Sequence, residues 1–282
     1  MEKTSEKPKV SIIIPTYNSE GTLLECLKAV FNQSYPFYEV IIVDSFSNDH
    51  TVRIAKEFGV KIIEQKCSPA SARNIGTANS TGKYVFFLDS DQVLSPYVVE
   101  ECVKMCEDEN IGMVSIPEIS VGKGFWGSCS ASWKNYYSKV GRSYVGSRAV
   151  SNAPRFFAKT FIVRVGMLTN NLLWGEDRDL HERLQRAGVK EAFCISKVYH
   201  NELTSIRSIL LKNLRYGKSI PIFLQRPQKQ VFPSLLNHAW LTIKEIFRDS
   251  KDDPALVIGC VILFCLKTYS TMIGILINMF LH

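Results

Sequence analysis

The chain has 282 residues, of which 46% are apolar and 22% are charged. This length gives one large domain or two modest ones with a real core, and the composition excludes a disordered chain, a fibre and a small disulfide-stapled module. The net charge is +7, and residues 203–251 hold all of that excess, because they contain nine basic and two acidic residues. A local cationic segment indicates an anionic partner, either a nucleic acid or a membrane surface.

The first half of the chain alternates short apolar runs with amphipathic segments of helical length, which is typical of a doubly wound α/β sheet. We expect strands at residues 10–14, 39–43, 60–63, 84–88 and 112–116, and helices at residues 20–33, 51–58, 71–79 and 96–109. Ligands bind at the carboxyl ends of the strands in such sheets. Polar residues directly after each apolar run are therefore candidate ligand contacts.

The second half of the chain is less regular. Three glycines within residues 122–127 predict a loop, which either closes over a substrate or simply connects two elements. After it we expect a helix near residues 128–140, an extended run at 155–165, a helix at 176–187 and a strand at 192–199.

The C-terminal residues 255–281 are apolar apart from Lys267 and a few hydroxyl or amide side chains. A helix of this length would reach about 40 Å, enough to cross a hydrocarbon core of about 30 Å with tilt. We therefore predict a transmembrane helix at residues 254–281. An in-plane or core helix is the alternative, because a lysine near the middle of a span costs about 3 kcal/mol.

The basic segment before this helix favours a membrane surface over nucleic acid as the anionic partner. Residues 233–250 alternate apolar and basic side chains, as in a helix that lies in the lipid interface. By the positive-inside rule, the large N-terminal part is expected on the cytoplasmic side of the cell membrane, held by a single C-terminal pass. Residues 1–9 are polar and resemble no signal peptide, so export is not expected.

Two carboxylates follow the apolar run Phe86-Phe87-Leu88, at Asp89 and Asp91. Hard divalent cations such as Mg²⁺ or Mn²⁺ take carboxylate and phosphate oxygens, so this D-x-D is a candidate metal site. Eight cysteines are scattered without a C-x-x-C pair. They are expected to be reduced packing residues, and Cys102 and Cys106 are expected to be core neighbours rather than zinc ligands.

Three further motifs accompany the D-x-D in a fixed order. Residues 10–18 read VSIIIPTYN, residues 43–49 read VDSFSND, and residues 72–76 read ARNIG. This ordered set resembles the family-2 glycosyltransferases of GT-A fold over about residues 9–218. The resemblance implies an α/β fold with a Rossmann-like, mixed but mostly parallel sheet flanked by helices, to which this chain adds the C-terminal membrane helix.

The resemblance also implies roles in binding a nucleoside-diphosphate sugar. Pro15 and Tyr17 would border the nucleobase, and Asp44 would accept a hydrogen bond from it. The family often has a second acidic residue where this chain has Ser45, which leaves UDP and GDP both open.

The phosphate side of the donor is assigned in the same way. Arg73 would lie near the base or the phosphates, and Asp89 near the ribose. Asp91 would hold the divalent cation, Mn²⁺ or Mg²⁺, that bridges the diphosphate. This is chemically coherent, because a cation and an arginine neutralise the charge that develops on a departing diphosphate.

The segment LLWGEDRDL at residues 172–180 matches the family's acidic segment at the start of the acceptor-side helix. An inverting transfer needs a carboxylate that takes the acceptor proton. By resemblance, Asp177 is that base and Glu176 is the second choice. Alternatively, these acids only stabilise a helix N-terminus.

Four more residues are carried over from the family. His200 would be a further metal or diphosphate ligand. Arg155, within the segment NAPRFF, Trp174, and Arg215, near the membrane end, are candidate contacts to the acceptor or to a phosphate.

The sequence thus predicts a membrane-bound, metal-dependent, inverting hexosyltransferase that resembles the transferases acting on polyprenyl or dolichyl phosphate and on lipid-linked oligosaccharides. Its acceptor would be a lipid phosphate or a lipid-linked saccharide. The expected organisation is a polar tail (1–9), a nucleotide-sugar-binding half (10–118), an acceptor-binding half (119–202), a basic membrane-interface segment (203–251) and the membrane helix (254–281). The alternatives are a soluble or protein acceptor, or a catalytically silent scaffold that binds nucleotide sugar. The oligomeric state stays open.

Overall fold

The computed structural model describes residues 7–108, 111–144, 154–170, 172, 174–224, 235–250 and 252–281. The chain divides into two compact units. The first unit comprises Met1–Glu118, Asn152–Asn171 and Gly175–Tyr199, and the second comprises Ile119–Ser151, Leu172–Trp174 and His200–His282.

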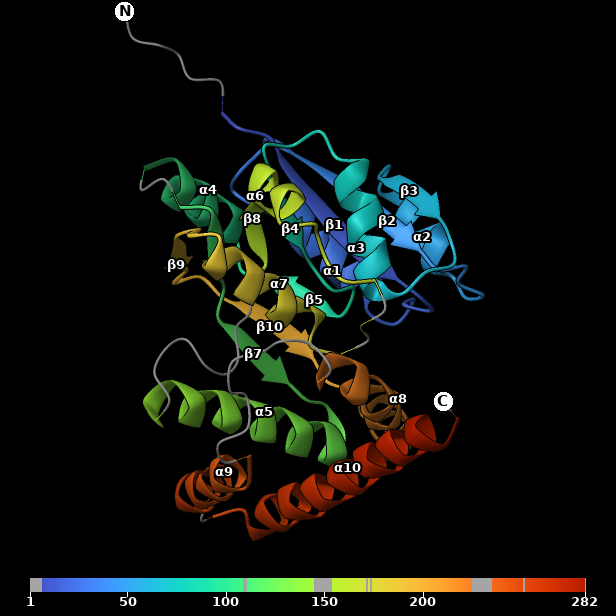
Figure 1. Cartoon of the computed structure of the whole chain (residues 1–282), viewed down its shortest axis with the longest axis vertical. Coiled ribbons are helices and arrows are strands. Elements are labelled where there is room, and N and C mark those ends of the chain that lie inside the picture. Colours follow the sequence, from blue (N-terminus) through green and yellow to red (C-terminus); the bar gives the residue numbers. More distant parts are fainter. Residues whose placement is uncertain are drawn as a thin grey trace, which may run out of the picture. The chain divides into compact units, whose positions relative to one another are not determined.

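The first unit is built on a seven-stranded sheet with the order β3-β2-β1-β4-β8-β6-β9 (Figure 1). Its strands are β1 (Val10–Thr16), β2 (Tyr38–Asp44), β3 (Lys61–Glu64), β4 (Tyr84–Phe87), β6 (Met113–Ser115), β8 (Phe156–Ala158) and β9 (Glu191–Phe193). Strands β1 to β4 pair with one another in parallel, whereas β8 runs antiparallel to both β4 and β6. The predicted mixed, mostly parallel sheet is therefore confirmed.

Helices cover both faces of this sheet. They are α1 (Leu23–Phe31), α2 (Thr51–Glu57), α3 (Pro69–Ala78), α4 (Val98–Asp108), α6 (Lys159–Arg164) and α7 (Glu176–Arg186). The central strand β1 explains this cover on both faces. Ile12 and Ile14 lie in one buried cluster with residues of α1 and α4, while Ile13 lies in another cluster with residues of α7. A strand that is apolar at successive positions needs cover on both sides.

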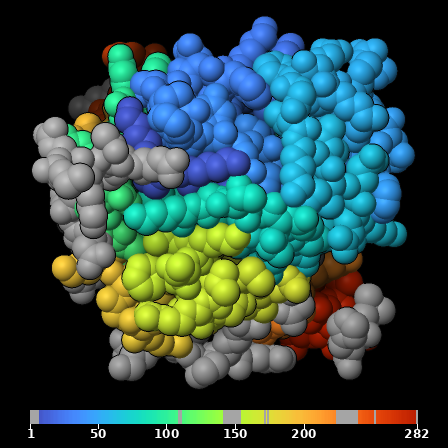
Figure 2. Space-filling view, turned by 90° about the horizontal axis from the view of Figure 1, so that it is seen from above, coloured from blue at the N-terminus to red at the C-terminus, as the bar shows by residue number. Residues whose placement is uncertain are grey.

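Segments far apart in the sequence meet at the surface of this unit. In the space-filling view (Figure 2), the teal stretch around α3 and the turn into β4 lies between the blue first part of the chain and the yellow-green α6. Across that border, Lys159 Nζ donates a hydrogen bond to the Ser80 carbonyl at 2.7 Å.

The second unit consists mainly of helices: α5 (Gly124–Tyr144), α8 (Ile206–Leu224), α9 (Leu235–Asp249) and α10 (Pro254–Leu281). Cys129 and Trp133 of α5, Ile246 of α9, and Cys260 and Leu263 of α10 share one buried cluster. Three short strands complete the described chain: β5 (Gln92–Leu94), β7 (Glu118–Val121) and β10 (Val198–Asn201).

Three expected elements differ from the structure. The predicted loop at residues 122–127 is mostly helical, because α5 begins at Gly124; a side chain at Gly122 would meet the Gly127 carbonyl at 2.0 Å, so this glycine permits a close approach of the backbone. The extended run at 155–165 is the short strand β8 followed by α6, whose Ile162 is buried. The strand at 192–199 is two strands, β9 and β10. For α6, tertiary packing overrode local propensity, because Ile162 lies in a buried cluster with residues of α7.

The C-terminal helix forms as predicted. By length and composition, Pro254–Phe280 is the one candidate membrane span within the described parts of the chain. Among the cysteines, Cys26, Cys102, Cys106, Cys129, Cys194 and Cys260 are buried, and all eight are free thiols.

Candidate active site

The carboxyl ends of β1 and β2 form the first part of the site. Asp44 is fully buried. It accepts hydrogen bonds from Thr16 Oγ1 at 2.7 Å, from Ser47 Oγ at 2.6 Å and from Ser47 N at 2.7 Å. Three donors thus already engage this carboxylate, and a nucleobase that bonds to it has to join or replace one of them. The predicted contact between Asp44 and the base stays a prediction.

The loops that follow β1 and β2 are joined to each other. Asn18 has a positive φ of 49°, a conformation that Asn tolerates better than most residues. Its N–H donates to Ser47 Oγ at 2.8 Å, and its Oδ1 accepts from the N–H of Asn48 at 2.9 Å. Beside this junction Tyr17 is 59% exposed, as a ring that borders a ligand must be. Pro15, also assigned to the base, lies within β1.

The ARN motif, residues 72–74, lies in helix α3. Its N-cap Ser68 accepts a hydrogen bond from Ser71 N at 3.2 Å, and Pro69 occupies the first turn. A Cβ at Gly76 would lie 2.3 Å from Ile13 Cγ2, so only glycine lets α3 pack this closely on β1. This contact sets the depth at which Arg73 enters the core.

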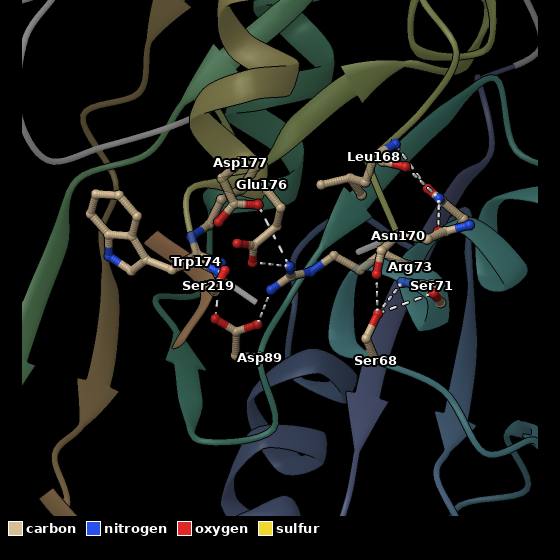
Figure 3. Close-up of polar contacts among 12 residues, drawn as sticks. Ser68, Ser71, Arg73, Asp89, Leu168, Asn170, Trp174, Glu176, Asp177 and Ser219 are labelled. Atoms are coloured by element: carbon tan, nitrogen blue, oxygen red, sulfur yellow. Dashed lines mark hydrogen bonds and ion pairs between the residues drawn. The ribbon is translucent and has the colours of Figure 1, made fainter. Parts of the chain in front are cut away.

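Arg73 is the centre of an ion-pair cluster (Figure 3). Its Nη2 lies 2.6 Å from Asp89 Oδ1, and its Nη1 lies 3.2 Å from Glu176 Oε1 and 3.5 Å from Asp177 Oδ1. Burial disfavours the charged guanidinium, but the three carboxylates outweigh it and raise the pKa of Arg73 above its usual value. Arg73 Nε is buried without a hydrogen-bond partner among the described residues.

A second arginine holds the other oxygen of the same carboxylate. Arg155 Nη1 lies 3.1 Å from Asp89 Oδ2, and its Nη2 lies 3.1 Å from Glu118 Oε2. Gln92 connects the two acids, because it accepts from Asp89 N at 3.0 Å and donates to Glu118 Oε2 at 2.9 Å. No sequence motif pointed to Glu118 or Gln92, although Glu118 follows the predicted strand at residues 112–116.

The acidic residues at the start of α7 divide into two groups. Gly175 precedes the helix with a φ of 82°, a left-handed conformation that suits glycine. Glu176 and Asp177 turn to Arg73, as described above. Asp179 instead accepts from Thr169 Oγ1 at 2.9 Å and from Arg183 Nη2 at 2.8 Å. Helix stabilisation therefore accounts for Asp179, while the first two acids belong to the Arg73 cluster.

Glu176 and Asp177 differ in exposure and environment. The Asp177 side chain is 34% exposed and that of Glu176 is 15% exposed. Burial and the neighbouring Asp177 carboxylate raise the pKa of Glu176 despite the Arg73 contact. The more accessible of the two carboxylates is therefore Asp177, the residue that resemblance assigns as base.

Asn74, the neighbour of Arg73 in the ARN motif, holds a different segment of the chain. Asn74 Nδ2 donates to the Leu168 carbonyl and to Asn170 Oδ1, both at 2.7 Å, and Asn74 Oδ1 accepts from Leu168 N at 3.0 Å. Ser68 Oγ also donates to the Asn170 carbonyl at 3.0 Å. Helix α3 thus fixes the segment that leads toward Glu176, and Asn74 is a positioning residue that the motif contained but the sequence did not explain.

The residues around the D-x-D fit a hard divalent cation that is only partly held by protein. Both oxygens of Asp89 are engaged by arginines, and Asp91 lies half-buried on the same turn. Within the described residues no group of three His, Cys, Asp or Glu side chains could hold a metal ion. Mg²⁺ and Mn²⁺ suit such a site, because they are commonly bound through one or two carboxylates together with substrate phosphates.

The second unit contains the remaining predicted residues. His200 Nδ1 lies 2.8 Å from the buried carboxylate of Glu202, which also pairs with Lys134 Nζ at 2.5 Å. Hydrogen bonds from His200 and the charge of Lys134 overcome burial and lower the pKa of Glu202. A carboxylate bonded to one imidazole nitrogen orients a ligating histidine, so this pair suits the role assigned to His200.

Trp174 and Arg215 also lie in the second unit. The backbone N–H of Trp174 donates to Ser219 Oγ of α8 at 3.2 Å, and Arg215 is exposed on the same helix. Their contacts to an acceptor or a phosphate stay predictions.

Comparisons with known proteins bear on the family of this chain. The model of the family described as glycosyl transferase family 2 matches residues 11–166. Glycosyltransferase AglE of Haloferax volcanii is 28% identical over 226 residues, which are 76% of this chain and 74% of that protein. Chondroitin synthase of Escherichia coli is also 28% identical, over 78% of this chain, but the match spans only 33% of that longer protein.

Solved structures show the same fold. Mannosyltransferase PcManGT of Pyrobaculum calidifontis, in complex with GDP-Man and Mn²⁺, has a TM-score of 0.60 at 18% identity, covering 97% of this chain and 86% of its own. TarS 1–349 of S. aureus, in complex with UDP, has a TM-score of 0.55 at 16% identity, covering 87% and 73%. The GT-A fold predicted from the motifs is thereby confirmed.

Proposed function

The chain belongs to glycosyl transferase family 2 and is a nucleotide-sugar-dependent glycosyltransferase, and from this premise we propose that it is an inverting, metal-dependent hexosyltransferase with a lipid-linked acceptor at the cytoplasmic face of the membrane. The observation that carries the proposal is the Arg73 cluster. It brings the acids at the start of α7 to the carboxylate of the D-x-D turn.

In this proposal Asp177 is the catalytic base. An inverting transfer requires the acceptor oxygen to attack the anomeric carbon from the side opposite the diphosphate, while a carboxylate takes the acceptor proton. Asp177 is partly exposed and held at the helix start by Arg73. Glu176 is more buried and its pKa is raised, so it is the poorer candidate for an ionised base at neutral pH.

The opposite end of the donor would be held by Asp91 and the two arginines. A divalent cation on Asp91 would supply charge neutralisation for the departing diphosphate. His200 keeps its proposed role as a metal or diphosphate ligand. Arg155 is the more accessible cation, because its side chain is 18% exposed and that of Arg73 is 5% exposed. Arg73 mainly positions Asp89, Glu176 and Asp177, while Arg155 and Trp174 are proposed to contact phosphate or acceptor.

The donor is a UDP- or GDP-linked hexose in this proposal. PcManGT is solved with GDP-Man and TarS with UDP, and Ser45 leaves the position next to Asp44 without the second acid that the family often has. Tyr17 and Pro15 would border the base.

The proposal of a lipid-linked acceptor is supported by the basic segment 203–251 and the apolar helix α10. An enzyme held at a membrane meets a lipid-borne acceptor at high effective concentration. A soluble or protein acceptor would not require this surface. Arg215, exposed on α8, is proposed to contact lipid phosphate.

The donor is tested by thermal-shift measurements with UDP- and GDP-sugars plus Mn²⁺. A sugar nucleotide at one hundred times its dissociation constant stabilises the folded state by about 2.7 kcal/mol. Transfer of labelled hexose to polyprenyl phosphate, to lipid-linked saccharide and to soluble sugar then separates the acceptor classes. Activity that is unchanged by a chelator would contradict the role of the cation.

Asp177→Asn tests the base. We expect transfer to fall about 100-fold or more, because general base catalysis contributes about 10²–10⁴, with donor binding retained. Glu182→Gln on the same helix is the matched control, since its carboxylate pairs with Arg178 and Arg186 of that helix. A fully active Asp177→Asn enzyme would exclude Asp177 as the base.

A further inference from the structure

Helix α10 packs along most of its length on α5 and α8 of its own unit (Figure 1). The ring of Phe264 stacks on Trp133 of α5, with ring centroids 4.5 Å apart. Farther along, Ser270 Oγ donates to the Leu210 carbonyl of α8 at 2.7 Å. These contacts lie on one face of α10.

Two glycines let α10 and α8 approach closely. A Cβ on Gly217 would lie 2.1 Å from the Thr271 carbonyl oxygen, and a Cβ on Gly274 would lie 2.2 Å from the Leu214 carbonyl oxygen. Backbones that are this close cannot separate without loss of a packed interface. The packing of α10 on α8 is therefore part of the fold of this unit.

The lysine of α10 has a polar partner on the same face. Lys267 Nζ lies 3.0 Å from Ser130 Oγ of α5, and Ser130 donates to Glu202 at 3.0 Å. Glu202 also holds His200 and Lys134. Lys267, the residue that disfavours a simple membrane span, thus has a hydrogen-bond partner inside the protein.

These contacts conflict with a helix that crosses a bilayer. From Leu256, whose carbonyl contacts Cys129, to Gly274 the helix rises about 27 Å at about 1.5 Å per residue, close to a hydrocarbon thickness of about 30 Å. Helix α8, packed on this stretch, exposes Arg207, Arg215 and Lys218. A spanning α10 would carry charged helices into the hydrocarbon with it, which is strongly unfavourable.

The opposite face of α10 is apolar and exposed. Its side chains recur every four and three residues along the whole helix: Ile258, Ile262, Cys265, Tyr269, Met272, Leu276 and Met279, which we name the α10 stripe. Helix α9 exposes a face that combines aromatic and basic residues, namely Trp240, Lys244, Phe247 and Arg248. Aromatic rings together with cations are typical of the membrane interface.

We propose that α10 lies in the plane of the membrane interface, with the α10 stripe inserted among the acyl chains of one leaflet that contains anionic lipids. The exposed face of α9 adds aromatic anchors and cations to the same contact. The proposal deepens the membrane attachment proposed above and rests on it. A coiled coil with a second copy is disfavoured, because Lys267 is the only charged residue of α10, whereas coiled coils flank the apolar seam with charges.

The depth of the stripe decides between in-plane and spanning placement. All labelled variants of the full-length chain carry Cys67→Ser. In the first, the fluorophore is attached at native Cys265. In the other three it is attached at Ile258→Cys, Met272→Cys or Met279→Cys, each combined with Cys265→Ser. Vesicles of phosphatidylcholine and phosphatidylglycerol carry quenchers at defined depths. The in-plane helix predicts one shallow depth for all four labels. A spanning helix predicts depths that pass through the bilayer centre, because Ile258 and Met279 are about 31 Å apart along the axis, and that result would overturn the proposal.

Vesicle flotation tests the attachment itself. Met272→Glu and Ile262→Glu are each expected to weaken binding about tenfold or more, since one buried apolar side chain contributes about 1.5–3 kcal/mol. Val121→Glu, at another exposed apolar position of the same unit, is the control. Absence of binding to anionic vesicles, or a soluble dimer that Met272→Glu dissociates, would refute the membrane as occupant. Neither experiment measures sugar transfer, so a wrong acceptor assignment would leave both results interpretable.

Discussion

Replacing Arg73 by glutamine tests whether the ion-pair cluster holds the site together. The side chain is 5% exposed and contacts Asp89, Glu176 and Asp177 at 2.6, 3.2 and 3.5 Å. Glutamine keeps a polar group but removes the charge, so the three carboxylates lose the cation that they share, while Arg155 still contacts Asp89.

The expected cost is about 3–5 kcal/mol of unfolding free energy, because removal of one partner leaves buried charge uncompensated. Adding Glu176→Gln should recover part of this loss, since the most buried of the three carboxylates is then neutral. A coupling energy of about 0.5–3 kcal/mol between the two positions is expected.

The measurement is urea unfolding at neutral pH of the wild type, both single variants and the double variant. Arg53→Gln is the matched control, because the Arg53 side chain is 68% exposed and lies 4.0 Å from Glu57 within one helix; it should change stability by less than about 1 kcal/mol. If Arg73→Gln costs no more than the control, or if the two substitutions are simply additive, the cluster does not carry the energy assigned to it.

Two further substitutions test the packing and the electrostatics of the sheet. Gly76→Ala should destabilise the protein by about 1–3 kcal/mol in the same assay, because its Cβ would lie 2.3 Å from Ile13 Cγ2. The control Gly21→Ala has open space around it and should be nearly neutral. Equal effects of the two substitutions would show that α3 can shift away from β1. Burial opposes ionisation of Glu39, but hydrogen bonds from Ser11 and Thr81 lower its pKa to about 2. The ionised Glu39 therefore contributes fully to the free energy of unfolding above the usual carboxyl pKa, and this contribution is lost as the pH falls from about 4.5 to about 2. Glu39→Gln should therefore lose about 2 kcal/mol at pH 7 and less at pH 3, and a loss that is independent of pH would contradict this role.

Much of the fold follows from local patterns. The apolar runs of β1, β2 and β4 and the amphipathic helices between them lie close to where the sequence predicts them, because a buried parallel strand needs a continuous apolar run. Such patterns fail in part at residues 155–165, where the strand ends at Ala158 and a helix follows, and at residues 122–127, where glycines lie in a helix start. There the packing partners are distant in sequence and local propensity has no access to them.

The site shows the same division. The ARN and D-x-D motifs point to Arg73 and Asp89, but Gln92, Glu118 and the clamping role of Asn74 emerge only from contacts. Single residues of these types occur throughout any chain, and nothing local marks them. Likewise, the sequence cannot distinguish Asp179, which bonds Thr169, from Asp177 two residues earlier, which faces Arg73.

By itself the sequence determines the family, the order of the strands that carry its motifs, and an apolar C-terminal helix, because each is written in contiguous residues. Tertiary structure decides which charges meet: Arg73 pairs with Glu176 across 103 positions, and Lys267 meets Ser130 across 137. It also decides which face of α10 stays exposed, because only packing against α5 and α8 separates the buried side chains of a mostly apolar helix from the exposed ones.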